Sequence, residues 1–174
     1  MTPPGDAILR ARARDQRLSG EHSAIQLESP KKVLQQIRAY LMARQDDGHP
    51  GTDLFRLRPK ESTDETLINL GPTIDKGATD GHFFLKSGAR LSFGLTLRSE
   101  TRHHSTLIAY RFDYRIENTV YRFDLNKDSH KSPLREPRGH FHPGTDNIRV
   151  PTPPLSPIEI LDIVFFTIEP EHKN

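Results

Sequence analysis

Cysteine is absent from the 174 residues of the chain. This absence excludes disulfide bonds, zinc sites built on thiolates and enzymes that use a cysteine nucleophile. Long hydrophobic runs are missing as well, since no stretch approaches the roughly 20 apolar residues that cross a bilayer. The segment MTPPGDAILRARARDQ at the N-terminus lacks the apolar core of a secretory signal. We therefore expect a soluble protein of the cytoplasm that binds no membrane.

Hydrophobic residues are also scarce, at 33% of the chain, while 28% of the residues are charged and 14 are proline. The length suffices for one domain with a core, but such a lean composition indicates that part of the chain lies outside it. We expect a flexible or partner-docked arm over residues 1–28 and a single α+β domain over residues 29–174.

Positive charge is spread unevenly along the chain. Residues 1–44 contain eight Arg and Lys against four acids, and residues 98–142 contain nine against six together with five of the nine histidines. Clustering of this kind favours an anionic partner for the middle region, although a mixed surface that is simply solvated is the common case.

Two segments have the pattern of a helix. Residues 29–45 begin with a serine and a proline suited to a helix start, and their apolar residues recur at helical spacing: Val33, Ile37, Tyr40 and Leu41. The second segment, 156–168, begins with Ser156 and Glu159 at the spacing of a capping box. Its β-branched run would also suit a buried strand, but the cap favours a helix. One apolar face is expected there: Ile158, Leu161, Val164, Phe165 and Ile168.

Between these helices the pattern is that of short strands. Strand-forming residues cluster at 54–58, 66–70, 82–86 and 90–98. A tight turn at Ser87-Gly88 would join the last two, and the polar stretch 71–81 has the composition of a loop. We therefore expect an α+β fold, a meandering antiparallel sheet with one face covered by the two helices.

A hairpin over residues 110–125, YRFDYRIENTVYRFDL, can be given a register. With Glu117-Asn118 as a two-residue turn, in which asparagine tolerates positive φ, paired positions sum to 235. Four complementary pairs then share this register: Tyr114 with Tyr121, Phe112 with Phe123, Asp113 with Arg122, and Arg111 with Asp124. Each pair contributes about 0.2–1 kcal/mol. Arg115 faces Val120 and has no acid opposite it.

The segment RGHFHPGTDN, residues 138–147, contains the most reactive-looking side chains. In a strand, His140 and His142 share one face about 7 Å apart, while Phe141 points to the core. Pro143-Gly144 suits a type II turn that ends the strand at once. We expect the histidines to lie at a sheet edge, where a side chain can be both held and exposed, and the sequence leaves their exposure open.

Three interpretations of the two histidines remain open. As an acid and a base they would cleave an RNA phosphodiester, with Arg138 or Arg115 stabilising the phosphate charge and with no metal or cofactor. As ligands they would join Asp146 in a metal site, although a third ligand could also come from His103, His104 or a remote acid. In the third interpretation they belong to a strand and turn, with both rings hydrogen-bonded or solvated. His103 and His104 themselves fit the rim of a hairpin.

The order of these segments resembles the TumE-like toxins of bacterial toxin–antitoxin pairs, or a sister family of unknown role. The matching pieces are YRFDYRIENTVYRFD, GHFHPG and VPTPPLSPIEILDIV, within residues 105–165. The resemblance implies a cytoplasmic prokaryotic toxin that acts on RNA and is neutralised by an antitoxin protein. The positions that would carry over are Arg111, Arg122, His140 and His142.

The leading hypothesis is thus a toxin-type ribonuclease or RNA-binding protein without a metal. Its catalytic candidates are His140, His142 and Arg138, and its substrate-binding candidates are Arg111, Arg115, Arg122, Arg135 and Tyr110. The alternative is a non-catalytic interaction subunit of a larger assembly, one that binds nucleic acid or another protein, with the arm and the proline-rich crossing at 150–157 as docking segments.

Overall fold

The computed structural model describes residues 24–44, 56–60, 67–73, 83–85, 87–126 and 139–169. Side chains are described in all of these ranges except 56–60 and 67–73. Most of the expected N-terminal arm, the break at 47–51 and residues 74–81 of the polar loop lie outside the described residues. In the part of the chain that is described, no helix has the length and apolar character needed to span a membrane.

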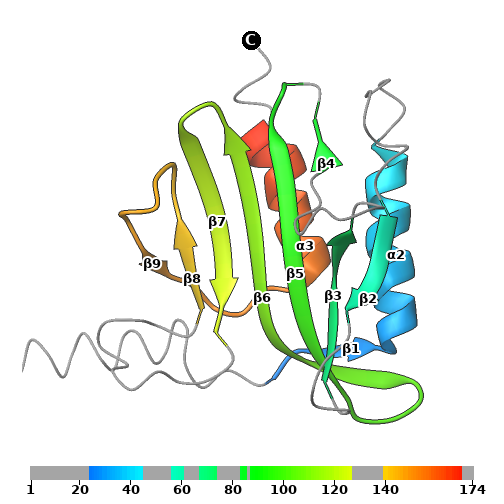
Figure 1. The fold of residues 1–174 in the computed structure, drawn as a ribbon. Helices are drawn as coiled ribbons and strands as arrows, with labels where there is room; N and C mark the ends of the chain where they lie inside the picture. Colours follow the sequence, from blue (N-terminus) through cyan, green and yellow to red (C-terminus); the bar gives the residue numbers. More distant parts are fainter. Residues whose placement is uncertain are drawn as a thin grey trace, which may run out of the picture.

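A single antiparallel sheet forms the body of the fold (Figure 1). Within the described residues it has nine strands, and its main path runs in the order β2-β3-β5-β6-β7-β8-β9, with β1 added to β6 and β4 to β5. The strands are β1 (Gln26–Glu28), β2 (Arg56–Lys60), β3 (Leu67–Thr73), β4 (Phe83–Phe84), β5 (Arg90–Ser99), β6 (His104–Ile116), β7 (Thr119–Leu125), β8 (Gly139–His142) and β9 (Val150–Pro151).

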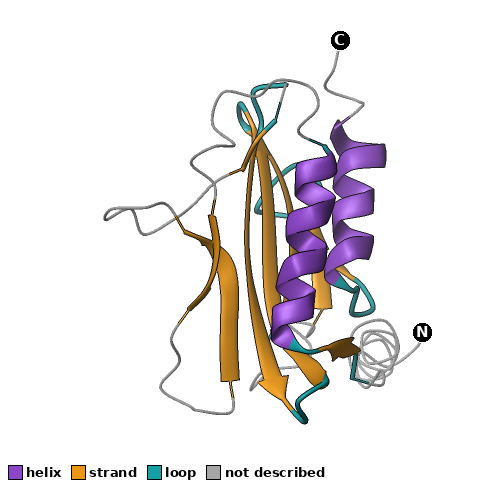
Figure 2. Cartoon of the chain, turned by 90° about the vertical axis from the view of Figure 1, so that its right-hand side faces the viewer, coloured by secondary structure: helices purple, strands orange, loops and turns teal. Residues whose placement is uncertain are grey.

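Both helices pack on one face of this sheet (Figure 2), so the expected α+β architecture is confirmed. Helix α2 (Pro30–Ala43) buries Val33, Ile37 and Leu41, three members of its expected apolar stripe. Helix α3 (Pro157–Ile163) continues into a wider π-helical turn, η3 (Val164–Ile168). The Tyr40 hydroxyl of α2 donates to Asp162 of α3 at 2.6 Å and links the two helices.

The capping box predicted at the start of the second helix is present. The Ser156 hydroxyl accepts from the Glu159 backbone N–H, and the Glu159 carboxylate accepts from the Ser156 N–H at 2.7 Å. The segment therefore forms the helix that the capping box predicted, and not the strand that its β-branched residues would also suit. Ile160 joins the buried face although the spacing did not predict it, because the face of α3 is wider than a single stripe.

Alternation along β5 shows how the sheet divides into two faces. Leu91, Phe93, Leu95 and Leu97 are buried beneath the helices, whereas the residues between them are more exposed. The tight turn that leads into β5 has the predicted glycine at φ +84°, a value that side chains disfavour. The second face of the sheet is therefore left for polar side chains.

The hairpin of β6 and β7 has the predicted register at every pair. Tyr114 faces Tyr121, Phe112 faces Phe123, and Arg115 faces Val120. One detail differs, because the positive φ of the turn falls on Glu117, at +49°, and not on the asparagine after it. The register is thus set by the aromatic and charged pairs rather than by the preferences of the turn residues.

Candidate functional site

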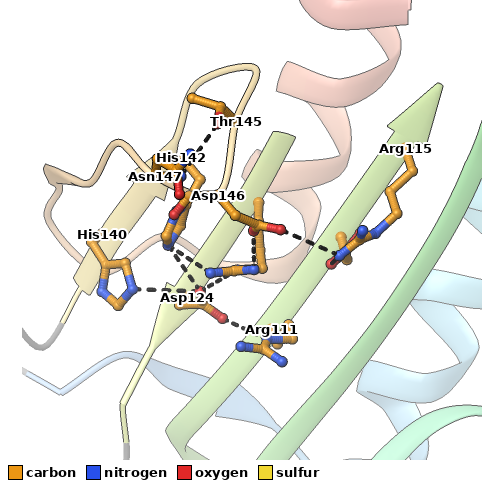
Figure 3. A network of polar contacts seen from close by, with 10 residues as sticks. Arg111, Arg115, Asp124, His140, His142, Thr145, Asp146 and Asn147 are labelled. Atoms are coloured by element: carbon orange, nitrogen blue, oxygen red, sulfur yellow. Dashed lines mark hydrogen bonds and ion pairs between the residues drawn. The ribbon is translucent and has the colours of Figure 1, made fainter. Parts of the chain in front are cut away.

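The candidate site lies on the face of the sheet away from the helices, over β6, β7 and β8 (Figure 3). Strand β8 pairs with β7 so that His140 faces Asp124 and His142 faces Arg122. Phe141 points the other way and stacks on Phe123, with ring centroids 4.5 Å apart. Parity along β8 therefore places both histidines on the polar face, as predicted, and their ring centroids are 5.1 Å apart.

The expected position of these histidines at the sheet edge is wrong, because β9 pairs with β8, and their exposure, which the sequence left open, is low. His140 is 5% exposed and His142 is fully buried. Strand β9 pairs with β8 on its outer side, and the loop after His142 folds back so that the carbonyl of Asp146 contacts the His142 ring. The sequence signal for β9 is two residues long, too short to be recognised as a strand.

Asp124 is the central group of the cluster. Its carboxylate accepts hydrogen bonds from Nε of Arg111 at 2.9 Å and from Nε of Arg122 at 2.7 Å. The Nε2 atoms of both imidazoles also approach Oδ2 of Asp124, at 3.4 Å for His140 and 3.5 Å for His142. Figure 3 shows the two rings and Arg111 directed at this carboxylate.

The charge of Asp124 is held by these contacts. Burial acts to raise the pKa of Asp124, but the hydrogen bonds from His140 and the two arginines outweigh it and keep the pKa far below its ordinary range. Asp124 is therefore ionised at neutral pH. A buried carboxylate of this kind can orient an imidazole, attract a cation or anchor the arginines around it.

His142 is held as a neutral ring. Nη2 of Arg122 lies 2.9 Å from Nε2 of His142, and arginine has only donors, so Nε2 accepts this bond. The proton then resides on Nδ1, which donates to the backbone carbonyl of Asp146 at 3.2 Å. Burial lowers the pKa of His142, and the charge of Arg122 lowers it further. This ring cannot supply a proton as a general acid while it keeps these contacts.

A second layer of ion pairs lies over β6. Arg115 makes a two-pronged contact with Asp113, at 2.6 and 2.9 Å, because side chains two residues apart on a strand share a face. The predicted pairing of Asp113 with Arg122 holds for the backbone register, but the Arg122 guanidinium contacts Asp124 and Asp146 instead. The charged surface is thus a linked network rather than a set of isolated cross-strand pairs.

Over β6, two arginines of this network are more exposed than the carboxylates they contact, whereas Arg122 is 12% exposed and Asp146 is 46% exposed. The carboxylates of Asp113 and Asp124 are buried, whereas the side chains of Arg111 and Arg115 are 63% and 45% exposed. Arg90 of β5 pairs with Arg115 across the sheet and is exposed as well. The outward surface over β5 and β6 therefore presents guanidinium groups.

The remaining predicted residues are not brought to this face by the described structure. Tyr110 is buried on the helix side of the sheet, where its hydroxyl accepts from the backbone N–H of Leu155 at 3.1 Å. Arg135 and Arg138 lie outside the described residues. His104 begins β6 and is exposed, in agreement with its expected place at the rim of a hairpin.

Asp124 and Arg90 were not singled out by the sequence as site residues. Asp124 had been paired with Arg111 alone, and its contact with the histidines depends on the pairing of β7 with β8 across an intervening segment. The place of Arg90 depends on the register between β5 and β6, which shifts at Thr96 and Leu97. Neither pairing can be read from local sequence.

Comparison with known families identifies the chain. The family model described as Toxin TumE matches residues 54–172. The chain belongs to the TumE toxin family. The match includes β2 to β5 as well as the hairpin and the histidine segment, so it is longer than the resemblance at residues 105–165 that the motifs alone supported. The comparison with curated proteins gives no match, and neither does the comparison with solved structures.

Family membership supports a toxin of a toxin–antitoxin system and, with it, a cognate antitoxin as partner. The site residues and the molecule on which the toxin acts are not addressed by the match.

Proposed function

We propose that this member of the TumE family acts on RNA, and that the polar face of the sheet binds the RNA backbone. The observation that carries the proposal is the row of exposed guanidinium groups of Arg90, Arg111 and Arg115, placed above buried carboxylates. Guanidinium groups match phosphate oxygens in geometry and charge.

The surface of the sheet is open at one point beside these groups. Gly94 lies opposite Arg111, and a Cβ atom at Gly94 would meet no atom within 4 Å. Arg111 is fixed through its Nε by Asp124, so its terminal nitrogens project outward from a defined position. Arg115 is held by Asp113 through both Nε and Nη2, so Nη1 is its one nitrogen that Asp113 does not engage. An arginine side chain that is already fixed by a hydrogen bond to a carboxylate loses less conformational entropy when it binds a phosphate.

For the reaction, we assign proton transfer to His140. Its Nε2 lies 3.4 Å from the Asp124 carboxylate, an arrangement that orients an imidazole. Such a ring can take the proton from a ribose 2′-hydroxyl. The 2′-oxygen then bonds to phosphorus, the bond from phosphorus to the 5′-oxygen breaks, and water supplies the proton to the leaving 5′-oxygen. His142 has a positioning role, because it holds Arg122 against Asp124. Arg135 and Arg138, which precede β8 in the sequence, stay candidates for phosphate binding.

The test compares variants for growth arrest and RNA integrity after induction in cells without the antitoxin. Arg111→Gln/Arg115→Gln should abolish arrest because it removes two exposed positive charges. Circular dichroism checks that the variant folds, since each arginine also pairs with a buried carboxylate. Arg38→Gln is the matched control, because Arg38 is exposed on α2 at the opposite side of the sheet. Full arrest by the double variant would contradict the proposal.

A second comparison separates cleavage from binding. His140→Gln should remove RNA degradation in cells while RNA binding by the purified protein is retained. If His140→Gln still arrests growth with intact RNA, the polar face binds RNA without cutting it, and the assignment of His140 as the reactive group is wrong.

A further inference from the structure

We propose that Asp124, His140 and His142 form a site for one divalent metal ion of the zinc class. All three side chains are buried, and one ligand atom from each lies within 4.8 Å of the others. Metal binding would be a separate property of this cluster, and it does not rest on the proposed action on RNA.

The distances within the cluster fit a tetrahedral ion. Zinc binds imidazole nitrogen and carboxylate oxygen at about 2.0–2.2 Å, so tetrahedral angles place neighbouring ligand atoms about 3.3–3.5 Å apart. The Asp124 Oδ2 atom lies 3.4 Å from Nε2 of His140 and 3.5 Å from Nε2 of His142. The separation between the two histidine ligand atoms is within 4.8 Å, so the imidazoles need only move together for the three groups to hold an ion.

The surroundings of His142 are those of a metal ligand. Its Nδ1–H donates to the backbone carbonyl of Asp146, which fixes the ring and leaves the lone pair on Nε2 facing Asp124. Ligating histidines in metalloproteins almost always make such a bond with the second nitrogen. His140 must carry its proton on Nδ1 in the same way when an ion is bound. On the other side of the site, Arg111 holds the second carboxylate oxygen of Asp124.

Arg122 is the internal competitor for this site. Its Nε donates to Asp124 Oδ2 and its Nη2 to Nε2 of His142, the same two atoms that an ion would take. Its Nη1 also pairs with Asp146. An ion would therefore displace two of these contacts while the guanidinium keeps the third. The affinity of the site is set by this exchange of one cation for another.

The donor set selects the class of ion. Two imidazoles and one carboxylate suit zinc and its neighbours in the first transition row, whereas calcium and magnesium prefer sites of oxygen ligands. An ion bound to Nε2 of His140 would replace the contact with Asp124 that orients this ring for the proposed proton transfer. Zinc should therefore inhibit the proposed reaction on RNA rather than support it.

The experiment uses the full-length chain made by cell-free synthesis without a histidine tag and treated with a chelator. Zn²⁺ is titrated by calorimetry, and Co²⁺ is titrated by visible absorption, because tetrahedral Co²⁺ absorbs far more strongly than hydrated Co²⁺. The wild-type chain should bind one ion with a tetrahedral Co²⁺ spectrum. Asp124→Asn, His140→Gln and His142→Gln should each weaken binding ten-fold or more, whereas His104→Gln, which changes an exposed histidine, should not.

Arg122→Met keeps the proposal testable if a ligand variant fails to fold. It removes the competing cation, so it should bind Zn²⁺ several-fold more tightly than wild type, and a folding defect cannot produce that change. Circular dichroism checks each variant. The proposal is overturned if wild type gives no tetrahedral Co²⁺ spectrum, or if the ligand variants bind as wild type does. Because no RNA is present, this result is independent of the outcome of the growth-arrest test.

Discussion

The guanidinium of Arg122 lies 2.9 Å from Nε2 of His142 and fixes that ring as a neutral acceptor. The contact joins β7 to β8 at one registered pair of the sheet. A sequence of the form His-x-His is usually read as a pair of equivalent reactive groups. Here the surroundings of the two rings differ, because Nε2 of His142 accepts from Arg122 whereas Nε2 of His140 lies against the Asp124 carboxylate.

The first prediction concerns the protonation of His142 in chelator-treated protein. Burial lowers its pKa from the ordinary value of 6.5, and Arg122 lowers it further. As pH falls, the unfolded chain therefore binds the proton first, and the folded state loses stability below about pH 6.5. Nitrogen NMR should show a neutral ring with its proton on Nδ1 at pH 7. Arg122→Gln should raise the pKa, and a ring found charged at pH 7 in wild type would refute this picture.

The second prediction concerns Asp124 and acid stability. The folded pKa of Asp124 is depressed below its ordinary 3.8, so its contribution is complete above about pH 4 and is lost as pH falls toward the folded value. Asp124→Asn removes the anion that accepts from the buried donors around it. The substitution should lower the free energy of unfolding by about 3 kcal/mol at pH 7. Urea unfolding at pH 7 and pH 3 measures this. The difference in unfolding free energy between Asp124→Asn and wild type should be smaller at pH 3 than at pH 7. An equal difference at both pH values would contradict the depressed pKa of Asp124.

The third prediction concerns the backbone at the start of β8. A Cβ atom on Gly139 would lie 2.6 Å from the carbonyl oxygen of Thr152. The two backbones are close here because the Thr152 N–H donates to the Gly139 carbonyl. Gly139→Ala should therefore cost about 1–3 kcal/mol in thermal or urea unfolding. Gly94→Ala is the control in the same sheet, since open space surrounds it, and it should gain about 0.5–1 kcal/mol. Equal effects of the two substitutions would show that the close approach does not matter.

Local sequence patterns were enough to predict the hairpin and both helices. Cross-strand pairs predicted the hairpin, and caps and apolar spacing predicted the helices. Four complementary pairs between β6 and β7 define one register, and any slip of one residue would turn aromatic side chains to the polar face. The cap at Ser156 and Glu159 marked the C-terminal helix. These features depend on residues that are close in sequence, and for that reason they can be read without the fold.

The site was predicted less completely, because its chemistry depends on distant pairings. The sequence indicated the two histidines and Arg111 as site residues. Asp124 contacts the histidines only because β7 pairs with β8. Their burial depends on β9 and on the loop at Asp146, neither of which has a distinct sequence pattern. The ion pair of Asp113 with Arg115 could not be predicted from the sequence either. Register determines which residues are neighbours, but side-chain rotamers determine which neighbours form the ion pair.

The central claim is that the exposed arginines bind phosphates, and salt dependence of RNA binding tests it most directly. Single-stranded RNA should bind the wild-type chain with an affinity that falls linearly, on logarithmic axes, with salt concentration. Loss of two phosphate contacts in Arg111→Gln/Arg115→Gln should reduce the magnitude of that slope by about 1.4 and weaken binding, whereas Arg38→Gln should change neither. Fluorescence anisotropy across a salt series gives both quantities. A slope that is the same in wild type and the double variant would contradict the account.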